Sequence, residues 1–113
     1  MRQLYTTVNV AAKDEEKSGF SLDYYVLSKE VTVENQRVHR FGIEIYKRGR
    51  RPNGNTYIEY RKIFDVFASE AEAIEMLDIL ARNTVTPISM KDILEDMLGN
   101  VEFAGEVLFV EAV

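Results

Sequence analysis

The chain has 113 residues, of which 46% are hydrophobic and 29% are charged, and its formal net charge is −5. This length and this composition are typical of one globular domain, and they argue against collagen-like, coiled-coil and disordered chains. The sequence contains no cysteine, which excludes disulfides, zinc–thiolate sites and thiol catalysis.

The charges are divided unevenly along the chain. Residues 36–62 carry eight Lys or Arg against two acids, a formal +6, whereas residues 63–113 carry eleven acids against two basic residues, a formal −9. Local potential, rather than net charge, decides which surfaces attract which partners. The division therefore predicts a basic pole and an acidic pole on one domain.

The N-terminal segment is predicted to begin with a strand. Residues 2–10 alternate in polarity, with Leu4, Thr6, Val8 and Val10 expected on one face. Residues 11–19 contain five charges and a glycine, which indicates a solvated connection. The segment lacks the apolar run of a secretion signal, and no stretch approaches the ~20 apolar residues of a membrane span, so we expect a cytoplasmic protein.

Three further strands are predicted, at residues 21–33, 38–48 and 56–67. The polar link 34–37 is too short for a parallel crossover, and the turn at 49–55 contains Pro and Asn-Gly, so each connection favours an antiparallel hairpin. The three strands are expected to form a meander. The apolar alternating positions of the first two are Tyr25, Leu27, Val31, Val33, Phe41, Ile43 and Ile45.

From residue 69 the apolar period changes from two to about 3.6, which is typical of helices. Ser69 and Glu72 form a capping-box pattern, which predicts a helix over residues 70–83. Thr86 as cap and Pro87 at the first helical position predict a second helix, which a glycine ends at residue 99. The expected inward positions are Ala73, Ile74, Leu77, Leu80, Ala81, Met90, Ile93, Leu94, Met97 and Leu98.

These elements predict a single domain over residues 1–113 with an α+β fold. We expect an antiparallel meander of three to four strands followed by two helices packed on one face. Its core spans roughly residues 20–99, and residues 100–113 form a C-terminal extension whose apolar run 107–110 is consistent with a short strand. The expected centre comprises Phe41, Ile43, Ile45, Phe64, Val66, Ile74, Leu77, Leu80, Leu94 and Leu98.

No residue pattern predicts catalysis. His39 is the only histidine, and no nucleophile or carboxylate is placed beside it by the strand pattern, so we interpret it as a surface imidazole. We therefore predict no catalytic residue, no cofactor and no enzymatic activity. The alternative, a small hydrolase or isomerase that uses Asp78 or Asp96, would require a closed pocket around the carboxylate.

Asp92, Glu95 and Asp96 share one face of the second predicted helix, because they lie at i, i+3 and i+4. Their oxygens are of the kind that magnesium or calcium prefers, but a closed site needs six or more oxygens and no EF-hand spacing occurs. We interpret the three residues as a solvated acidic surface and predict no metal site.

The basic hairpin over residues 46–62 is the strongest candidate for a binding surface. Such a ribbon can follow a phosphate backbone while tyrosine rings stack on bases. The competing interpretation is a charged edge that prevents strand-to-strand aggregation or pairs with the acidic helices. The candidate residues are Lys47, Arg48, Arg50, Arg51, Tyr57, Tyr60 and Arg61.

The order of local motifs resembles a known family. FGIEIYKRG at 41–49, a Ser-capped helix at Ser69, Thr86 before Pro87, and Glu95 before Asp96 follow the pattern of a family of small, uncharacterised bacterial proteins, chiefly from Firmicutes. The resemblance extends from residue 22 to residue 99 and implies a fold but no activity. Residues beyond 99 are more numerous than in the family's pattern.

The sequence therefore favours a non-enzymatic protein-interaction or regulatory module. A protein partner or self-association through the exposed sheet edge or the apolar tail is expected. The alternative is contact with nucleic acid through residues 46–62. Neither a membrane nor a small-molecule ligand is inferred.

Overall fold

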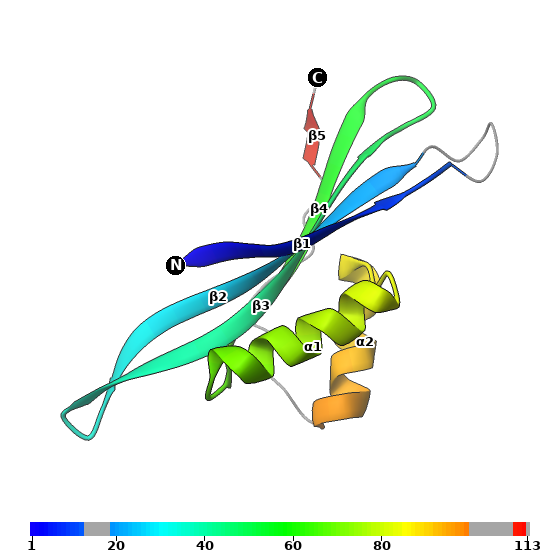
Figure 1. Cartoon of the computed structure of the whole chain (residues 1–113). Coiled ribbons are helices and arrows are strands. Elements are labelled where there is room, and N and C mark those ends of the chain that lie inside the picture. Colours follow the sequence, from blue (N-terminus) through cyan, green and yellow to red (C-terminus); the bar gives the residue numbers. More distant parts are fainter. Residues whose placement is uncertain (13–18, 100–109, 113) are drawn as a thin grey trace.

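The computed structural model describes residues 1–12, 19–99 and 110–112. Its strands form one antiparallel sheet in the order β1-β2-β3-β4-β5, and two helices follow β4 (Figure 1). The elements are β1 (Arg2–Val10), β2 (Phe20–Val33), β3 (Gln36–Arg50), β4 (Thr56–Phe67), α1 (Glu70–Arg82), α2 (Pro87–Leu98) and β5 (Val110–Ala112). The predicted meander followed by two helices is confirmed. Residues 107–109 of the predicted tail strand lie outside the described residues.

The turn between β2 and β3 is tighter than predicted. Val33 pairs with Gln36, so only Glu34 and Asn35 form the loop, and their φ angles are 50° and 66°. Two successive left-handed residues form the turn type that matches the twist of an antiparallel hairpin. The polar link at 34–37 is therefore a two-residue turn rather than a four-residue loop.

β2 turns even-numbered residues toward the helices, not the odd-numbered residues that were predicted to form its apolar face. Leu22, Tyr24 and Val26 face the helices, whereas Tyr25 and Leu27 lie on the other face of the sheet. The prediction was wrong because β2 is apolar on both faces between residues 22 and 27. Tyr24 is fully buried, and its hydroxyl donates to the backbone oxygen of Val85 at 2.9 Å, so the inward phenol is satisfied.

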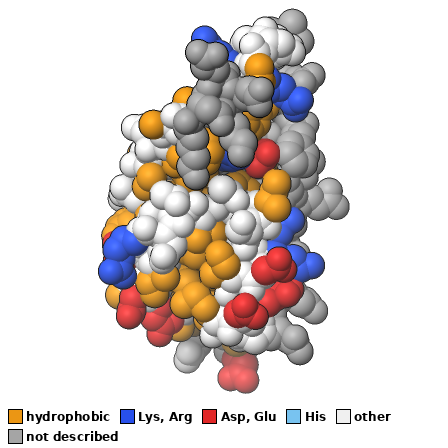
Figure 2. Space-filling view, turned by 90° about the vertical axis from the view of Figure 1, so that its right-hand side faces the viewer, with side chains coloured by type: hydrophobic (Ala, Val, Ile, Leu, Met, Phe, Trp, Pro, Cys, Tyr) orange, Lys and Arg blue, Asp and Glu red, His pale blue; other side chains and the backbone are white. Residues whose placement is uncertain are grey.

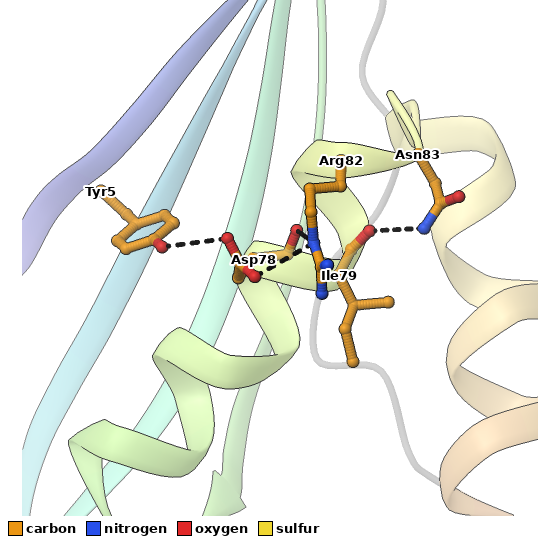
Figure 3. Close-up of polar contacts among 5 residues, drawn as sticks. All are labelled: Tyr5, Asp78, Ile79, Arg82 and Asn83. Carbon is orange, nitrogen blue, oxygen red and sulfur yellow. Dashed lines mark hydrogen bonds and ion pairs between the residues drawn. The ribbon is translucent and has the colours of Figure 1, made fainter.

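A β-bulge changes the facing of β1. Leu4 pairs with Tyr25 and Thr6 with Tyr24, which leaves Tyr5 as an extra residue. Leu4 therefore lies on the opposite face from Thr6, and the expected single stripe along β1 is wrong. The hydroxyl of Tyr5 donates to the carboxylate of Asp78 in α1 at 3.4 Å, as Figure 3 shows.

Local capping defines both ends of α1. The amide of Glu72 donates to the Ser69 hydroxyl at 3.2 Å as predicted, but the Glu72 carboxylate accepts from the amide of Ala68 rather than from that of Ser69. At the C-terminal end the Asn83 side chain donates to the Ile79 carbonyl at 2.7 Å (Figure 3). The helix limits are therefore those that the sequence predicts.

One core joins the sheet to both helices. Ile43, Ile45, Leu77, Leu80 and Leu94 are fully buried as expected. Two residues expected in the centre are not there: Phe64 is half-buried on the face without helices, and Leu98 is exposed at the end of α2, as is Met97, which was expected to face inward. Met90 is fully buried, as its inward position predicts. The buried positions missed in the prediction include Leu22, Tyr24, Val26, Ile63, Phe67 and Met76. Neither described helix combines the length and the apolar character needed to cross a membrane.

The buried phenol of Tyr24 makes stability depend on pH. Burial raises the pKa of Tyr24 from 10 to about 12. The folded state therefore favours the neutral phenol, and this contribution is complete below pH ~10 and is lost as the pH rises towards 12, by about 2 kcal/mol. Urea unfolding at about pH 8 and pH 11.5 should show a smaller alkaline loss in Tyr24→Phe than in the parent chain. Equal losses in the two proteins would contradict this role of Tyr24.

Candidate binding surface

Strand alternation divides the predicted basic cluster between two faces. Lys47 pairs with Leu22 and Arg61 pairs with Ile45, so these two cations lie on the helix side. Arg48 and Tyr60 lie on the opposite face, which carries neither of the described helices and which we call the open face. The predicted residues therefore do not form one continuous surface.

The helix-side members of the cluster are largely withdrawn from solvent. The Lys47 side chain is only 15% exposed and lies 3.8 Å from the buried carboxylate of Glu59. Its ammonium group lies between two rings, 4.3 Å from the centroid of Phe20 and 5.4 Å from that of Tyr57. Lys47 is thus engaged in the fold through ion-pair and cation–π contacts.

The open face instead combines aromatic rings with a different set of cations. Tyr46 and Tyr60 stack at 6.3 Å between centroids with an interplanar angle of 22°. The ammonium of Lys62 lies 5.5 Å from the ring centroid of Tyr60 and 5.7 Å from that of Phe64. The rings lie side by side on neighbouring strands, so the open face carries a row of π-surfaces bordered by charge.

A partly buried ion pair lies beside this row. The Glu44 side chain is 4% exposed and accepts from Nε of Arg2 at 2.7 Å. Arg2 also lies over the ring of Tyr25, at 3.5 Å from its centroid. Burial lowers the pKa of Arg2, but the hydrogen bond and the charge of Glu44 raise it above its ordinary value. Arg2 is therefore held as a cation on the open face.

The other buried acid of the open face is also fully engaged. Asp23 accepts from the Thr7 hydroxyl at 2.7 Å and lies 3.3 Å from a guanidinium nitrogen of Arg48. Arg48 is 59% exposed and retains donors for a ligand. Asp23 and Glu44 are thus each paired with an arginine of the sheet.

Charge separates cleanly between the two layers. By strand register, the open face carries Asp23 and Glu44 against six cations, and Asp65 of β4 adds a third acid beside Arg40. The six are Arg2, Lys29, Arg40, Arg48, Arg50 and Lys62. The two helices carry seven acids against Arg82 and Lys91. Figure 2 shows acidic side chains gathered in its lower part, while Lys and Arg side chains lie at its upper end and also at both sides of the lower part.

Two hollows of the open face lie on either side of the aromatic row. One, of about 420 Å³, lies near the β3–β4 turn and is lined by Arg48, Arg50 and Ile58. The other, of about 390 Å³, is lined by Arg2, Lys62 and Phe64 among others. Both volumes fall within the range of small-molecule sites.

A second bulge shapes the hollow near Lys62. Phe41 pairs with Phe67 and Ile43 with Ile63, so β4 places residues 64–66 opposite the single residue Gly42 of β3. Asp65 in this bulge has a φ of 58°, in the left-handed region. A Cβ on Gly42 would lie 2.0 Å from the Ile63 carbonyl oxygen, so this position requires glycine.

The other predicted sites are separate from the open face. His39 is exposed, stacks on Phe41 at 6.5 Å, and pairs across the sheet with Glu30. Asp92, Glu95 and Asp96 are exposed on α2, with Lys91 4.0 Å from Glu95. Within the described ranges, no three His, Cys or acidic side chains are grouped as metal ligands would be.

Several open-face residues were missed in the sequence interpretation. Arg2, Tyr25 and Lys62 were not assigned to any surface, and Phe64 was placed in the core. The missed signal is the alternation along the two strands: every second residue from Tyr46 to Arg50 and from Tyr60 to Phe64 is aromatic or basic, and these residues share one face of the sheet. Asp78 and Asp96, considered for catalysis, line neither of the two hollows.

Comparison with known proteins matches the chain to a protein family. The model of a family of unknown function (DUF6514) covers residues 1–100. The match includes the N-terminal strand, which the resemblance over residues 22–99 left out, and it ends where the predicted C-terminal extension begins. No curated protein and no solved structure shows significant similarity to the chain. A Firmicutes origin stays a prediction.

Proposed function

The chain belongs to this family of unknown function, and we propose, from the geometry of its open face, that it binds single-stranded nucleic acid without catalysis. The observation that supports this proposal best is the row of half-buried aromatic rings, two of them stacked, bordered by six cations on one face of the sheet. Single strands are bound by such platforms, because every base has a π-face and every nucleotide carries a phosphate.

The arrangement favours a polymer over a compact anion. The two hollows lie at the two ends of the aromatic row, so charged side chains and rings alternate along a path rather than converge on one point. A duplex would keep its bases stacked inside and offer only phosphates to this face. A single strand can use both parts of the surface.

The charge on the open face also decides against its use as a symmetric interface between two copies. A two-fold contact would bury this cation-rich face of one copy against the same face of the other and so bring cations of the two copies close together. Like charges brought together in an interface cost several kcal/mol. The open face is therefore better matched to a polyanion than to itself.

The proposal is tested by fluorescence anisotropy with labelled single-stranded DNA and RNA of about ten nucleotides at two salt concentrations. We expect binding whose affinity falls steeply as salt is raised, because each phosphate that the protein neutralises releases counterions. The double variant Arg48→Ala/Arg50→Ala should weaken binding and reduce the salt slope by about 0.7 for each phosphate that is no longer neutralised.

The matched control is Arg37→Ala/Arg82→Ala, which removes the same charge from two exposed arginines away from the open face. This control should bind as the parent does. Absence of binding at low salt, or equal weakening in both double variants, would overturn the proposal. Heparin, a polyanion without bases, should compete less well than the oligonucleotide, since it cannot stack.

The protein-interaction module favoured by the sequence is the second candidate. Ile88 and Met97 are exposed on α2, at 55% and 47%, and an exposed apolar helix surface is typical of contact sites. Light scattering across a concentration series tests self-association: a mass that rises with concentration in the parent, and not in Ile88→Ser/Met97→Ser, would support it. A constant monomer mass would exclude self-association through α2.

The proposed function also includes a location in the cytoplasm.

A further inference from the structure

The hollow beside Gly42 has the composition of a site for an anion joined to a flat apolar group. Its wall contains Leu27 and the ring of Phe64, and its rim contains Arg2, Lys29, Arg40 and Lys62. Leu27 is buried and Phe64 is half-buried, so the apolar wall is fixed in the sheet. The volume of about 390 Å³ is sufficient for one nucleotide-sized group.

The four cations of the rim differ in whether they form ion pairs with acids of the protein. Arg2 is held by Glu44 at 2.7 Å, and Arg40 donates to the backbone oxygen of Asp65 at 2.9 Å and lies 3.8 Å from its carboxylate. Lys29 and Lys62 form no ion pair with any described residue. Glu44, which faces Lys62 across the sheet, and Asp65 also line the hollow, but their ion pairs are made with Arg2 and Arg40. The hollow therefore offers two ammonium groups that no described carboxylate holds in an ion pair.

The hollow is bordered by Arg40 and Asp65 on the side away from the aromatic row. Arg40 and Asp65, linked to each other, line both this hollow and the next one towards the β2–β3 turn, so they form the wall between the two. On another side, Met1 is joined to β2 by the hydrogen bond from the Ser28 amide to its carbonyl at 2.8 Å. A nucleic-acid strand that runs along the aromatic row from the β3–β4 turn would therefore reach Arg40 and Asp65 at the far side of this hollow.

We propose that this hollow receives the terminal nucleotide of the bound strand, with a terminal phosphate between Lys29 and Lys62 and the base against Phe64. This inference rests on the proposed function. A terminal phosphate monoester carries more negative charge than an internal diester, and it would be matched by the two ammonium groups that have no ion-pair partner. The partly buried Glu44–Arg2 pair keeps the adjoining wall in place.

The test compares three oligonucleotides of one sequence, which carry a 5′-phosphate, a 3′-phosphate or hydroxyl groups at both ends. We expect one phosphorylated form to bind about tenfold more tightly than the unphosphorylated form. An unphosphorylated strand one nucleotide longer, which adds an internal charge, controls for total charge. In Lys29→Ala/Lys62→Ala the preference should vanish, while Arg37→Ala/Lys91→Ala should retain it.

The outcomes separate the inference from the proposed function. Binding of all three oligonucleotides with equal affinity would overturn the terminal site and leave strand binding intact. Absence of any binding would overturn both. A preference that persists in Lys29→Ala/Lys62→Ala would overturn the assignment to this hollow, provided that circular dichroism and thermal unfolding show the variant to be folded.

Discussion

Replacement of Tyr46 and Tyr60 by alanine is expected to weaken binding of a single-stranded oligonucleotide by about two orders of magnitude. Stacking of a base on an aromatic side chain contributes about 1–3 kcal/mol, and each 1.4 kcal/mol is a tenfold change in Kd. The two rings are themselves stacked at 6.3 Å on adjacent strands, so both belong to one surface. Anisotropy titrations of the parent and the double variant measure the change.

Two controls separate stacking from other effects. Tyr46→Phe/Tyr60→Phe keeps both rings and removes only the two hydroxyls, so affinity should stay within about twofold of the parent. Tyr5→Ala removes an exposed tyrosine on the helix side and should leave binding unchanged. If the phenylalanine variant lost as much affinity as the alanine variant, stacking would not be the cause.

Gly42→Ala is expected to produce the largest loss of stability, about 3 kcal/mol or more. The new Cβ would lie 2.0 Å from the Ile63 carbonyl oxygen and 2.9 Å from the Phe64 Cα, and both are backbone atoms of β4. Neither can move without breaking the pairing of β3 with β4. Urea unfolding gives the free-energy difference, and a variant that does not fold would be the extreme form of the same result.

Gly49→Ala is the matched comparison on the same strand. There the closest atoms to a new Cβ, at 2.5 Å, belong to the far end of the Tyr57 ring, which a rotation of the side chain can withdraw. The loss of stability should be smaller by at least about 1 kcal/mol. Equal losses at the two glycines would contradict the argument that the β4 backbone over Gly42 imposes glycine there.

The sequence predicts the elements well because their signals are local. Ser69 and Thr86 accept from the amides of Glu72 and Ser89, as their capping patterns indicate, and Pro87 begins α2. A change of apolar period from two to 3.6 after the last long strand is equally local. These features depend on spacing along the chain and need no knowledge of tertiary contacts.

Which side chains of a strand point toward the core depends on tertiary contacts, and the spacing of residues along the chain does not reveal these contacts. β2 is apolar on both sides, so the choice of Tyr24 over Tyr25 for the core is decided by Val85, which is distant in sequence. The bulge at Tyr5 also reverses which alternate residues of β1 point toward the helices, and the bulge opposite Gly42 interrupts the alternation along β4. A basic hairpin could be recognised, but its division into a buried helix side and an accessible open face could not.

The opposite charges of the helical layer and the sheet give the molecule a permanent dipole that runs through its thickness. A polyanion that comes within about 8 Å of the protein, the Debye length at physiological ionic strength, attracts the basic open face and repels the acidic helices. The resulting torque would turn the molecule before any side chain touches its ligand. Added salt should therefore slow association more than it speeds dissociation, which depends on short-range stacking.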